Sequence, residues 1–415
     1  MAQSPLRTAA AGLIGNVLEW FDYAVYGYFS TEIGAQFFPA HWDKEDKALL
    51  TWIIFFLGFV PRAIGGVALG LIGDRVGRRA LLTVSIALMG GATLIIGLLP
   101  GYATIGIFAP ALLLLMRLLQ GFSLGGEFTG SMVYTTELSS PLLRGLIASS
   151  TAAGTTLGFI LGSLTAYLVS RGLGPEASAD WGWRIPFIGS ILFCLLGWML
   201  RRGIEEPEQG VKAAAQRVPV VQSLITDWKP IIQTFGIVAM TNAAYYLTFT
   251  WAVERRKAED TDFQPMNTLS LLVVLFAKLF GGWLSDRVGR RKLMMAMTVM
   301  LMCTIYFGQH FMLHGSPGTF FVGQVMLGIP LAMALGLQGA MVVEIFPLRS
   351  RVTSMSIAYS IALALSGGTA PLVATWLIAE TGNLLAPAWY AMVFGAIGLA
   401  IMLPMQETNG RALDT

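Results

Sequence analysis

Charged residues are scarce in this chain of 415 residues. Asp, Glu, Lys and Arg make up only 12% of it, whereas hydrophobic residues make up 55% and the mean hydropathy is +0.66. A soluble domain carries roughly 25% charged residues, so this composition excludes an ordinary soluble fold. Cysteine is almost absent as well. Cys194 and Cys303 lie in separate apolar stretches, which excludes both a disulfide framework and a paired-cysteine metal site.

Several motifs that would indicate other functions are also missing. There is no Gly-rich nucleotide loop of the GxxxxGK[ST] type and no polar stretch large enough for an ATPase domain. No Ser/His or Cys/His arrangement supplies a nucleophile with its base, so we expect no enzyme activity. His310 and His314 are four apart but lack an acidic third ligand, so we expect no metal site and no cofactor. The net charge of +3 gives no reason to expect a nucleic-acid partner.

Long, unalternated apolar runs dominate what is present. In a bilayer the backbone must satisfy its own hydrogen bonds, so a chain crosses as helices of about 20 apolar residues or as a closed barrel of alternating strands. The runs favour helices and predict an all-α membrane protein. We expect twelve transmembrane helices, near residues 9–36, 47–72, 80–100, 104–134, 145–170, 183–202, 230–252, 266–284, 292–313, 318–345, 352–380 and 386–405.

The basic residues predict the orientation of these helices. Of 27 Lys and Arg residues, 17 fall on one side of the predicted spans, 7 on the other and 3 inside spans. Cytoplasmic loops carry the Lys/Arg excess, so both termini are expected in the cytoplasm. The first apolar stretch already contains Glu19 and Asp22, which predicts a retained helix rather than a cleaved signal peptide. We therefore expect a multi-pass protein of a bacterial-type inner membrane.

One short loop motif occurs twice, as GDRVGRR over residues 73–79 and SDRVGRR over residues 285–291. A second echo relates TTELSSPLLRG, starting at Thr135, to VVEIFPLRSR, starting at Val342. Such repeats indicate two equivalent halves. We expect six-helix halves over residues 1–202 and 230–415, joined by a cytoplasmic linker over residues 203–229.

Charge pairs at the motifs are expected to hold the two halves together on the cytoplasmic side. The residues assigned to this gating are Asp74, Arg75, Gly77, Arg78, Arg79, Asp286, Arg287, Gly289, Arg290 and Arg291.

These motifs resemble those of the major facilitator superfamily, whose loop between helices 2 and 3 reads G-x-x-x-D-R-x-G-R-R. The matching segments are GLIGDRVGRR from Gly70 and GGWLSDRVGRR from Gly281. Further segments resemble the metabolite:proton symporter branch of this superfamily. They are GNVLEWFDYAVYGY in the first predicted helix, RLLQGFSLGGEF in the fourth, and EIFPLRSR and QETNGR near the carboxyl end. The resemblance covers the whole chain. It implies the major facilitator fold and carriers of citrate, 2-oxoglutarate, shikimate, proline or betaine. The charged segment WAVERRKAEDTDF, from Trp251, and Lys278 depart from the branch pattern.

Ionisable residues inside predicted spans are candidates for proton coupling. A charge near the bilayer centre costs at least about 2.5–3.5 kcal/mol, so such residues are functional by default. Glu19 and Asp22 share one helix face, and either can accept a proton. Pairing with Arg62 or Arg117 to hold the fold is the alternative interpretation. Arg117 belongs to an R-x-x-Q-G pattern. The resemblance to the superfamily implies that the arginine of this pattern lies near the proton site. The assigned coupling residues are Asp22, Glu19, Arg117 and Glu127.

Other polar residues in the spans are candidates for binding the solute. Arg62 can clamp a carboxylate bidentately, and Lys278 either reaches a solute or snorkels to the cytoplasmic surface. Hydroxyls and amides in the second half can position a polar solute, although tyrosines in spans often serve only in packing. The assigned binding residues are Arg62, Gln120, Asn242, Tyr245, Tyr246, Lys278, Gln338 and Tyr359.

The sequence thus predicts a monomeric, proton-coupled symporter that imports a small organic acid by alternating access. Arg62 and Lys278 favour a carboxylate on Coulomb grounds. The alternative solute is a zwitterionic osmolyte or amino acid such as proline or betaine. A non-transporting membrane sensor is the second alternative, but it predicts decayed motifs or an added signalling domain, and the sequence has neither.

Overall fold

A computed structural model gives the structure of the chain and describes residues 5–76, 78–201, 219–257, 263–348, 350–411 and 413. These residues contain helices and no β-strand. By length and hydropathy, seven of the described helices can cross a bilayer, and Ala87–Leu98 and Ala386–Met402 form shorter apolar helices. The predicted linker lies largely outside the described residues, because residues 202–218 are not among them.

The helices of the first half follow the predicted spans closely. They are α1 (Pro5–Tyr28), α2 (Ser30–Phe37), α3 (Lys44–Leu57), α4 (Pro61–Val76), α5 (Arg78–Leu98), α6 (Tyr102–Ile105), α7 (Phe108–Ser123), α8 (Glu127–Glu137), α9 (Arg144–Ala177) and α10 (Arg184–Arg201), with the π-helical turn η1 (Ser178–Gly182) before α10. Several predicted spans are pairs of helices. For example, α3 and α4 form one span interrupted before Pro61, because proline cannot continue the hydrogen-bond ladder of α3.

The second half repeats this plan. Its helices are α12 (Val220–Thr226), α13 (Trp228–Tyr246), α14 (Ala252–Lys257), α15 (Phe263–Val288), α16 (Arg290–His314), α17 (Pro317–Ile345), α18 (Arg351–Leu363), α19 (Ala370–Thr381) and α20 (Ala386–Met402), with π-helical turns η2 (Leu247–Trp251) and η3 (Ala364–Gly368). Each of the twelve predicted spans coincides with one of these helices or with a consecutive pair. The predicted all-α, twelve-span architecture is therefore confirmed.

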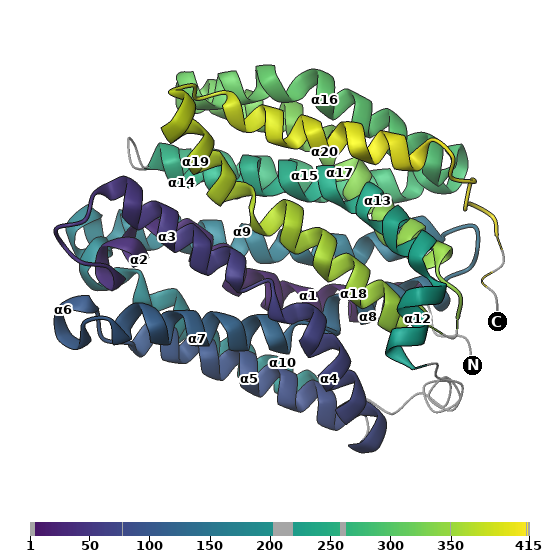
Figure 1. The fold of residues 1–415 in the computed structure, drawn as a ribbon, viewed down its shortest axis with the longest axis horizontal. Helices are drawn as coiled ribbons and strands as arrows, with labels where there is room; N and C mark the ends of the chain where they lie inside the picture. The colour runs from purple at the N-terminus through teal and green to yellow at the C-terminus, as the bar shows by residue number, and fades with distance from the viewer. Residues whose placement is uncertain are drawn as a thin grey trace.

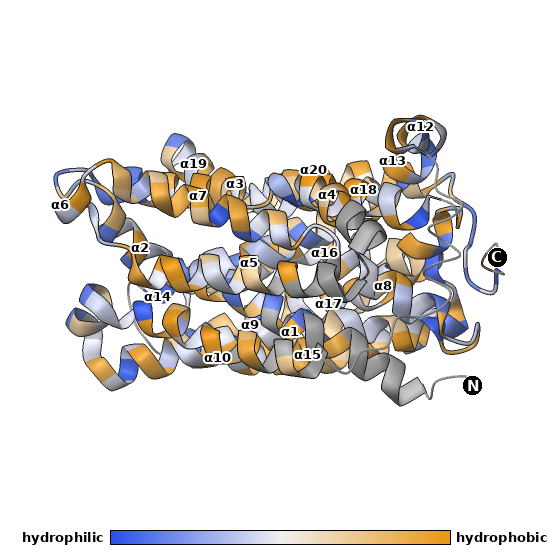
Figure 2. Cartoon of the chain, turned by 90° about the horizontal axis from the view of Figure 1, so that it is seen from below, coloured by the Kyte–Doolittle hydropathy of each residue, from blue (hydrophilic) through white to orange (hydrophobic). Residues whose placement is uncertain are grey.

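The helices run roughly parallel to the long axis of the molecule, and the two halves lie side by side (Figure 1). Both chain termini lie at one end, which we call the motif end because it carries the segment Ser285–Arg291. The opposite end, the distal end, carries α2, α6 and α14. Apolar residues cover most of the helix surfaces, and hydrophilic residues gather toward the two ends (Figure 2). This is the distribution expected of a bundle that crosses a bilayer.

Small residues bring the central helices into close contact. Gly336 of α17 lies so near α15 that a Cβ built on it would stand 1.9 Å from the carbonyl oxygen of Lys278. A Cβ on Gly281 of α15 would in turn stand 2.4 Å from the backbone of Met333. Helix pairs in membranes use such small residues because van der Waals contact supplies much of their attraction. The position of Lys278 is therefore fixed by glycine contacts on either side of it.

We expect Gly336→Ala to lower the thermal stability of the purified protein by several degrees. The added methyl group overlaps the backbone of α15, and overpacking of this kind costs about 1–3 kcal/mol. Gly91→Ala is the matched control, since a Cβ at that helical glycine of α5 meets nothing within 4 Å. Equal melting temperatures for the two variants in detergent would contradict the close approach of α15 and α17.

Candidate functional site

A small cavity lies between the two halves. Both halves contribute to its wall through α1, α8 and α9 on one side and α13, α15, α17 and α18 on the other. The lining residues are Trp20, Phe128, Met132, Ala152, Thr155, Phe159, Asn242, Tyr245, Tyr246, Lys278, Leu335, Gln338 and Tyr359. None of these residues is acidic, so the wall has one cation and no compensating carboxylate.

Lys278 supplies that cation from the middle of α15. Its side chain is 2% exposed, and its Nζ donates to the carbonyl oxygen of Ala152 at 3.0 Å and to Oγ1 of Thr155 at 3.1 Å. The Nζ also lies 5.2 Å from the ring centroid of Tyr245, within range of a cation–π contact. Among the described residues no carboxylate pairs with it. Burying an ammonium that only neutral groups contact is costly, and an anion beside it would lower that cost.

The snorkelling interpretation of Lys278 is wrong. The ammonium group bonds across to α9 instead of extending along α15 to the surface. Five other predicted binding residues also line the cavity, namely Asn242, Tyr245, Tyr246, Gln338 and Tyr359.

Polar groups on this wall are partly unpaired. Within the described part of the chain, the hydroxyl oxygens of Tyr245 and Tyr246 and the indole nitrogen of Trp20 are buried and have no hydrogen-bond partner. Gln338 is paired on both sides, since it accepts from Thr241 at 2.9 Å and donates to Tyr359 at 3.2 Å. Three buried donors and Lys278 therefore lie on a cavity wall that has no acid among its described residues. A solute that carries acceptor oxygens would satisfy them.

Arg62 and Gln120, which we expected in the solute site, are not among the lining residues. Arg62 of α4 pairs with Glu19 of α1 at 2.8 Å, and both side chains are almost completely buried. The guanidinium lies 5.6 Å from the ring centroid of Trp20, which does line the cavity. The ion pair thus lies behind Trp20, a residue of the aromatic wall of the cavity.

Asp22 ends a chain of hydrogen bonds that begins at Arg117. Arg117 Nη1 donates to Gln120 Oε1 at 2.9 Å, Gln120 Nε2 donates to Thr93 Oγ1 at 2.6 Å, and Thr93 lies 2.6 Å from Asp22 Oδ2. All four side chains are buried. Arg117 therefore reaches Asp22 through Gln120 and Thr93, whereas the alternative interpretation of the sequence was a direct pair with Arg62 or Arg117. Donors that point in one direction along such a chain strengthen one another.

The guanidinium of Arg117 is held in place by aromatic rings. It lies 4.6 Å from the ring centroid of Tyr23 and 4.3 Å from that of Tyr26, both on α1. Arginine tolerates such burial because its charge is delocalised and weakly hydrated. Asp22 is therefore a buried carboxylate connected to a buried cation, and ionisable residues inside a membrane are candidates for a functional role.

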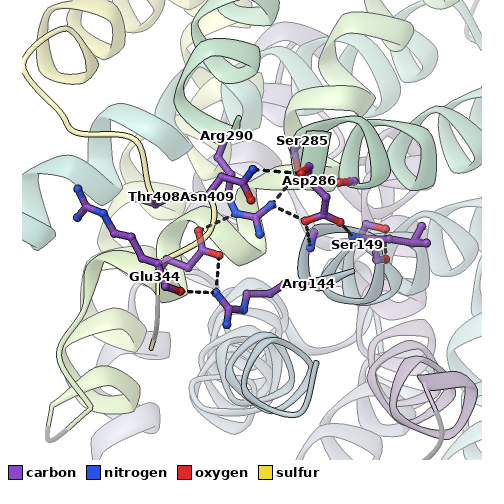
Figure 3. Close-up of polar contacts among 12 residues, drawn as sticks. Arg144, Ser149, Ser285, Asp286, Arg290, Glu344, Thr408 and Asn409 are labelled. Carbon is purple, nitrogen blue, oxygen red and sulfur yellow. Dashed lines mark hydrogen bonds and ion pairs between the residues drawn. The ribbon is translucent and has the colours of Figure 1, made fainter. Parts of the chain in front are cut away.

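The second motif copy joins the two halves at the motif end. Asp286 of α15 accepts hydrogen bonds from the backbone amides of Gly145 at 2.8 Å and Leu146 at 3.0 Å, both at the start of α9. An aspartate there also interacts favourably with the positive end of the helix dipole. Arg290 holds Asp286 at 3.1 Å and Glu344 at 2.6 Å (Figure 3). The predicted contact between the halves is present at this motif.

The second sequence echo produces two reciprocal ion pairs. Arg144 of the first half pairs with Glu344 of the second at 3.3 Å, and Arg351 of the second half pairs with Glu137 of the first at 2.5 Å. Figure 3 shows the first of these pairs beside Arg290. Each echo therefore supplies one acid and one arginine to the other half, as a pseudo-twofold arrangement requires.

The carboxyl-terminal segment closes over this network. Burial favours the neutral form of Glu407, but the amides of Asn409, Arg290, Arg291 and Thr408 donate to its carboxylate and lower its pKa below the ordinary value. These amides therefore keep the carboxylate ionised next to the second motif.

Other predicted gating residues lie near this segment or outside the described part. Gly289 has φ +104° and approaches Glu407, which explains the glycine of the motif. Arg291 donates to the carbonyl oxygens of Met402 and Leu403, and exposed Arg287 stacks on Trp283 at 3.9 Å. Gly77 lies outside the described residues, and so do the side chains of Asp74, Arg75, Arg78, Arg79 and Glu127.

Several residues of the site carried no recognisable signal in the sequence. Thr93, which connects Gln120 to Asp22, is one uncharged residue among many in an apolar helix. Thr155 and Phe159 show that α9 lines the cavity, although that span contains no charge. Trp20, next to Glu19, could have been found by asking which aromatic residues accompany the buried charges.

Two six-helix halves around a central cavity, closed at the motif end by ion pairs between the halves, define a secondary transporter. Comparison with known families agrees. The family described as "Sugar (and other) transporter" matches residues 8–207, and the one described as "Major Facilitator Superfamily" matches residues 234–411. The chain belongs to the major facilitator superfamily. The protein is therefore a multi-pass integral membrane transporter of a small molecule and not an enzyme.

Similar proteins cover nearly the whole chain. A proline/betaine transporter of Salmonella typhimurium is 33% identical over 98% of this chain and 84% of its own. A glycine betaine/proline/ectoine/pipecolic acid transporter of Dickeya dadantii is 34% identical over 98% of this chain and 84% of its own. Among solved structures, a D-xylose-proton symporter superimposes with a TM-score of 0.76 at 19% identity, covering 99% of this chain and 100% of its own. At that identity the last comparison shows the shared fold.

Proposed function

We propose that this transporter imports a small carboxylate-bearing solute together with protons. One observation carries the proposal: Lys278 is a buried ammonium without a carboxylate partner among the described residues, in a cavity whose lining contains no acid. A solute carboxylate would supply the missing charge, and the unpaired hydroxyl groups of Tyr245 and Tyr246 would add hydrogen bonds to it.

Two solute classes fit a carboxylate subsite, and the aromatic wall discriminates between them. Trp20, Phe128, Phe159 and the tyrosines surround the remaining space, and aromatic faces attract alkylated ammonium groups. A second anionic group would find no further cation on the lining. One cation in an aromatic cavity favours a zwitterion over a di- or tricarboxylic acid. The proline and betaine transporters among the relatives favour the same choice. A monocarboxylic organic acid is the second candidate, favoured by Lys278 alone.

The coupling ion is a proton that binds at Asp22, and no cofactor takes part. Two observations support this assignment. Asp22 is buried, and a chain of hydrogen bonds connects it to Arg117. A proton on Glu19 would instead release Arg62 and act on the cavity through Trp20. The motif end faces the cytoplasm in a bacterial-type inner membrane, because 17 of the 27 basic residues lie on that side. The protein works as a monomer and binds no nucleic acid.

We expect proteoliposomes containing this protein to accumulate labelled betaine or proline when the external pH is below the internal pH. Citrate, 2-oxoglutarate and shikimate serve as competitors. Competition by betaine and proline at much lower concentrations than by the polycarboxylates would match one cationic subsite in an aromatic cavity. Failure of every carboxylate-bearing solute to compete, with uptake of a neutral or purely cationic solute instead, would overturn the proposal.

A further inference from the structure

A buried ion cluster joins the two halves at the distal end. Lys257 of α14 lies 2.7 Å from Glu32 Oε1 of α2 and 3.7 Å from Glu254 Oε2 of its own helix, and it donates to the carbonyl oxygen of Tyr28 at 2.8 Å. Glu254 Oε1 accepts the backbone amide of Thr31 at 2.9 Å. The second half therefore holds the junction of α1 and α2 by a charge and by a backbone hydrogen bond. Glu254 and Lys257 belong to the charged segment WAVERRKAEDTDF, which starts at Trp251.

Two carboxylates in this cluster share one ammonium. Glu254 is 4% exposed and Glu32 is 9% exposed, and the Oε2 atom of each has no hydrogen-bond partner in the described part of the chain. With every group ionised the cluster carries an excess negative charge in a buried place, which is unfavourable. One additional proton removes that excess charge.

The neighbouring elements offer no other charge to the cluster within the described residues. Tyr28 of α1 donates its hydroxyl to the carbonyl oxygen of Phe249, and α15 contributes the neutral side chains of Gln264 and Asn267 to this region. Arg256 is turned to the end of α16, where it donates to the carbonyl oxygens of Leu313 and Gly315. Among the described residues, the charged groups that act on Glu254 are therefore Lys257 and Glu32.

The surroundings of Glu254 decide whether a bound proton stabilises the closed or the open distal end. Glu254 lies beyond the predicted span 230–252. Burial raises its pKa from 4.5 to about 7, with Lys257 and the Thr31 amide lowering it and Glu32 raising it. When the distal end opens, water reaches the carboxyl group and its pKa returns toward the ordinary value. The closed state thus binds the proton more tightly, so its extra stability is complete below about pH 4.5 and is lost as the pH rises through 7.

We propose that Glu32, Glu254 and Lys257 form a proton-operated latch, in which Glu254 takes up a proton from the distal side as that end closes and releases it to the same side on opening. The distal side is the outside in the proposed orientation. Because this proton returns to the side from which it came, it changes the rate of the transport cycle and not the number of protons transported. Coupling at Asp22 is a separate event.

The test measures a distance, so its outcome does not depend on the solute or on coupling. Spin labels are placed at Ala35→Cys in α2 and Thr381→Cys at the end of α19, both exposed positions at the distal end. The background carries Cys194→Ser, Cys303→Ser and Asp22→Asn, which removes the native thiols and the proposed coupling site. Pulsed dipolar spectroscopy on protein in liposomes then compares external pH values of about 5.5 and about 8.5, which bracket the titration.

We expect the population with a long distance to increase at the higher external pH. Glu254→Gln, which mimics the protonated group, is expected to remain closed at both pH values. Glu32→Gln should move the midpoint to lower pH and Lys257→Gln to higher pH, because the first removes a repulsion and the second an attraction. An unchanged distance distribution across this pH range would overturn the proposal, and so would a Glu254→Gln protein that keeps the full pH response. If Glu254→Gln does not fold, midpoint shifts of the other two variants in the same direction would overturn it.

Discussion

Lys278→Met should reduce the affinity for a carboxylate-bearing solute by about 30-fold or more while leaving the ligand-free protein at least as stable as before. Loss of a buried, hydrogen-bonded charge partner costs about 2–5 kcal/mol, and 1.4 kcal/mol corresponds to a factor of ten. The protein itself loses little, because replacing an unpaired buried charge by an apolar side chain is neutral or stabilising. Thr155 and Ala152 also keep a hydrogen bond to each other at 2.7 Å.

Two measurements check this result. Uptake at graded betaine concentrations gives the apparent affinity, and a melting curve without ligand gives the stability. Lys44→Met is the matched control, because Lys44 is exposed at the distal end and should affect neither quantity. A Lys278→Met protein that melts at a lower temperature but binds normally would assign this lysine to the fold and remove it from the solute site.

Asp22→Asn should abolish uphill accumulation driven by a pH gradient while preserving exchange of labelled for unlabelled solute. Asparagine can still accept the hydrogen bond from Thr93, so the local packing is kept, but an amide cannot take up the coupling proton. The accumulation ratio in proteoliposomes is expected to fall to about 1, as for a carrier that only equilibrates its solute.

The coupling test includes two further variants. Asp46→Asn changes an exposed acid at the distal end and should leave accumulation intact. Glu19→Gln tests the other carboxylate of α1, which is paired with Arg62. If Asp22→Asn still accumulates solute against its gradient and Glu19→Gln does not, the coupling site belongs to the Glu19–Arg62 pair.

The architecture could be predicted because hydrocarbon permits few alternatives. An apolar run of sufficient length must form a helix there, and a motif written twice must occupy equivalent places in two halves. The boundaries differ by only a few residues, for example 292–313 as predicted against Arg290–His314 in the structure. The break between α3 and α4 could not be predicted from the sequence. Pro61 indicates that a helix can be interrupted there, but it does not show that the span is divided into two helices.

The candidate site was predicted only in part, because partners are chosen by contacts between distant segments. Charge alone identified Glu19, Arg62 and Lys278. It did not show that the first two are 2.8 Å apart behind the cavity, whereas the third faces the cavity without a carboxylate partner in the described part of the chain. Neutral residues such as Thr93 have no distinguishing signal, since a hydroxyl matters here only through the two side chains it connects.

The sequence by itself determined that this protein crosses a membrane, that its two halves are equivalent, and which few charges lie inside. Those conclusions follow from the cost of placing polar groups in hydrocarbon, which depends on local composition. Only the tertiary structure decided how those charges are distributed. It paired Arg62 with Glu19, separated Arg117 from Asp22 by two side chains, and left Lys278 facing the cavity. The reason is geometric, because electrostatic energy depends on distances of a few ångströms between helices that are far apart in the chain.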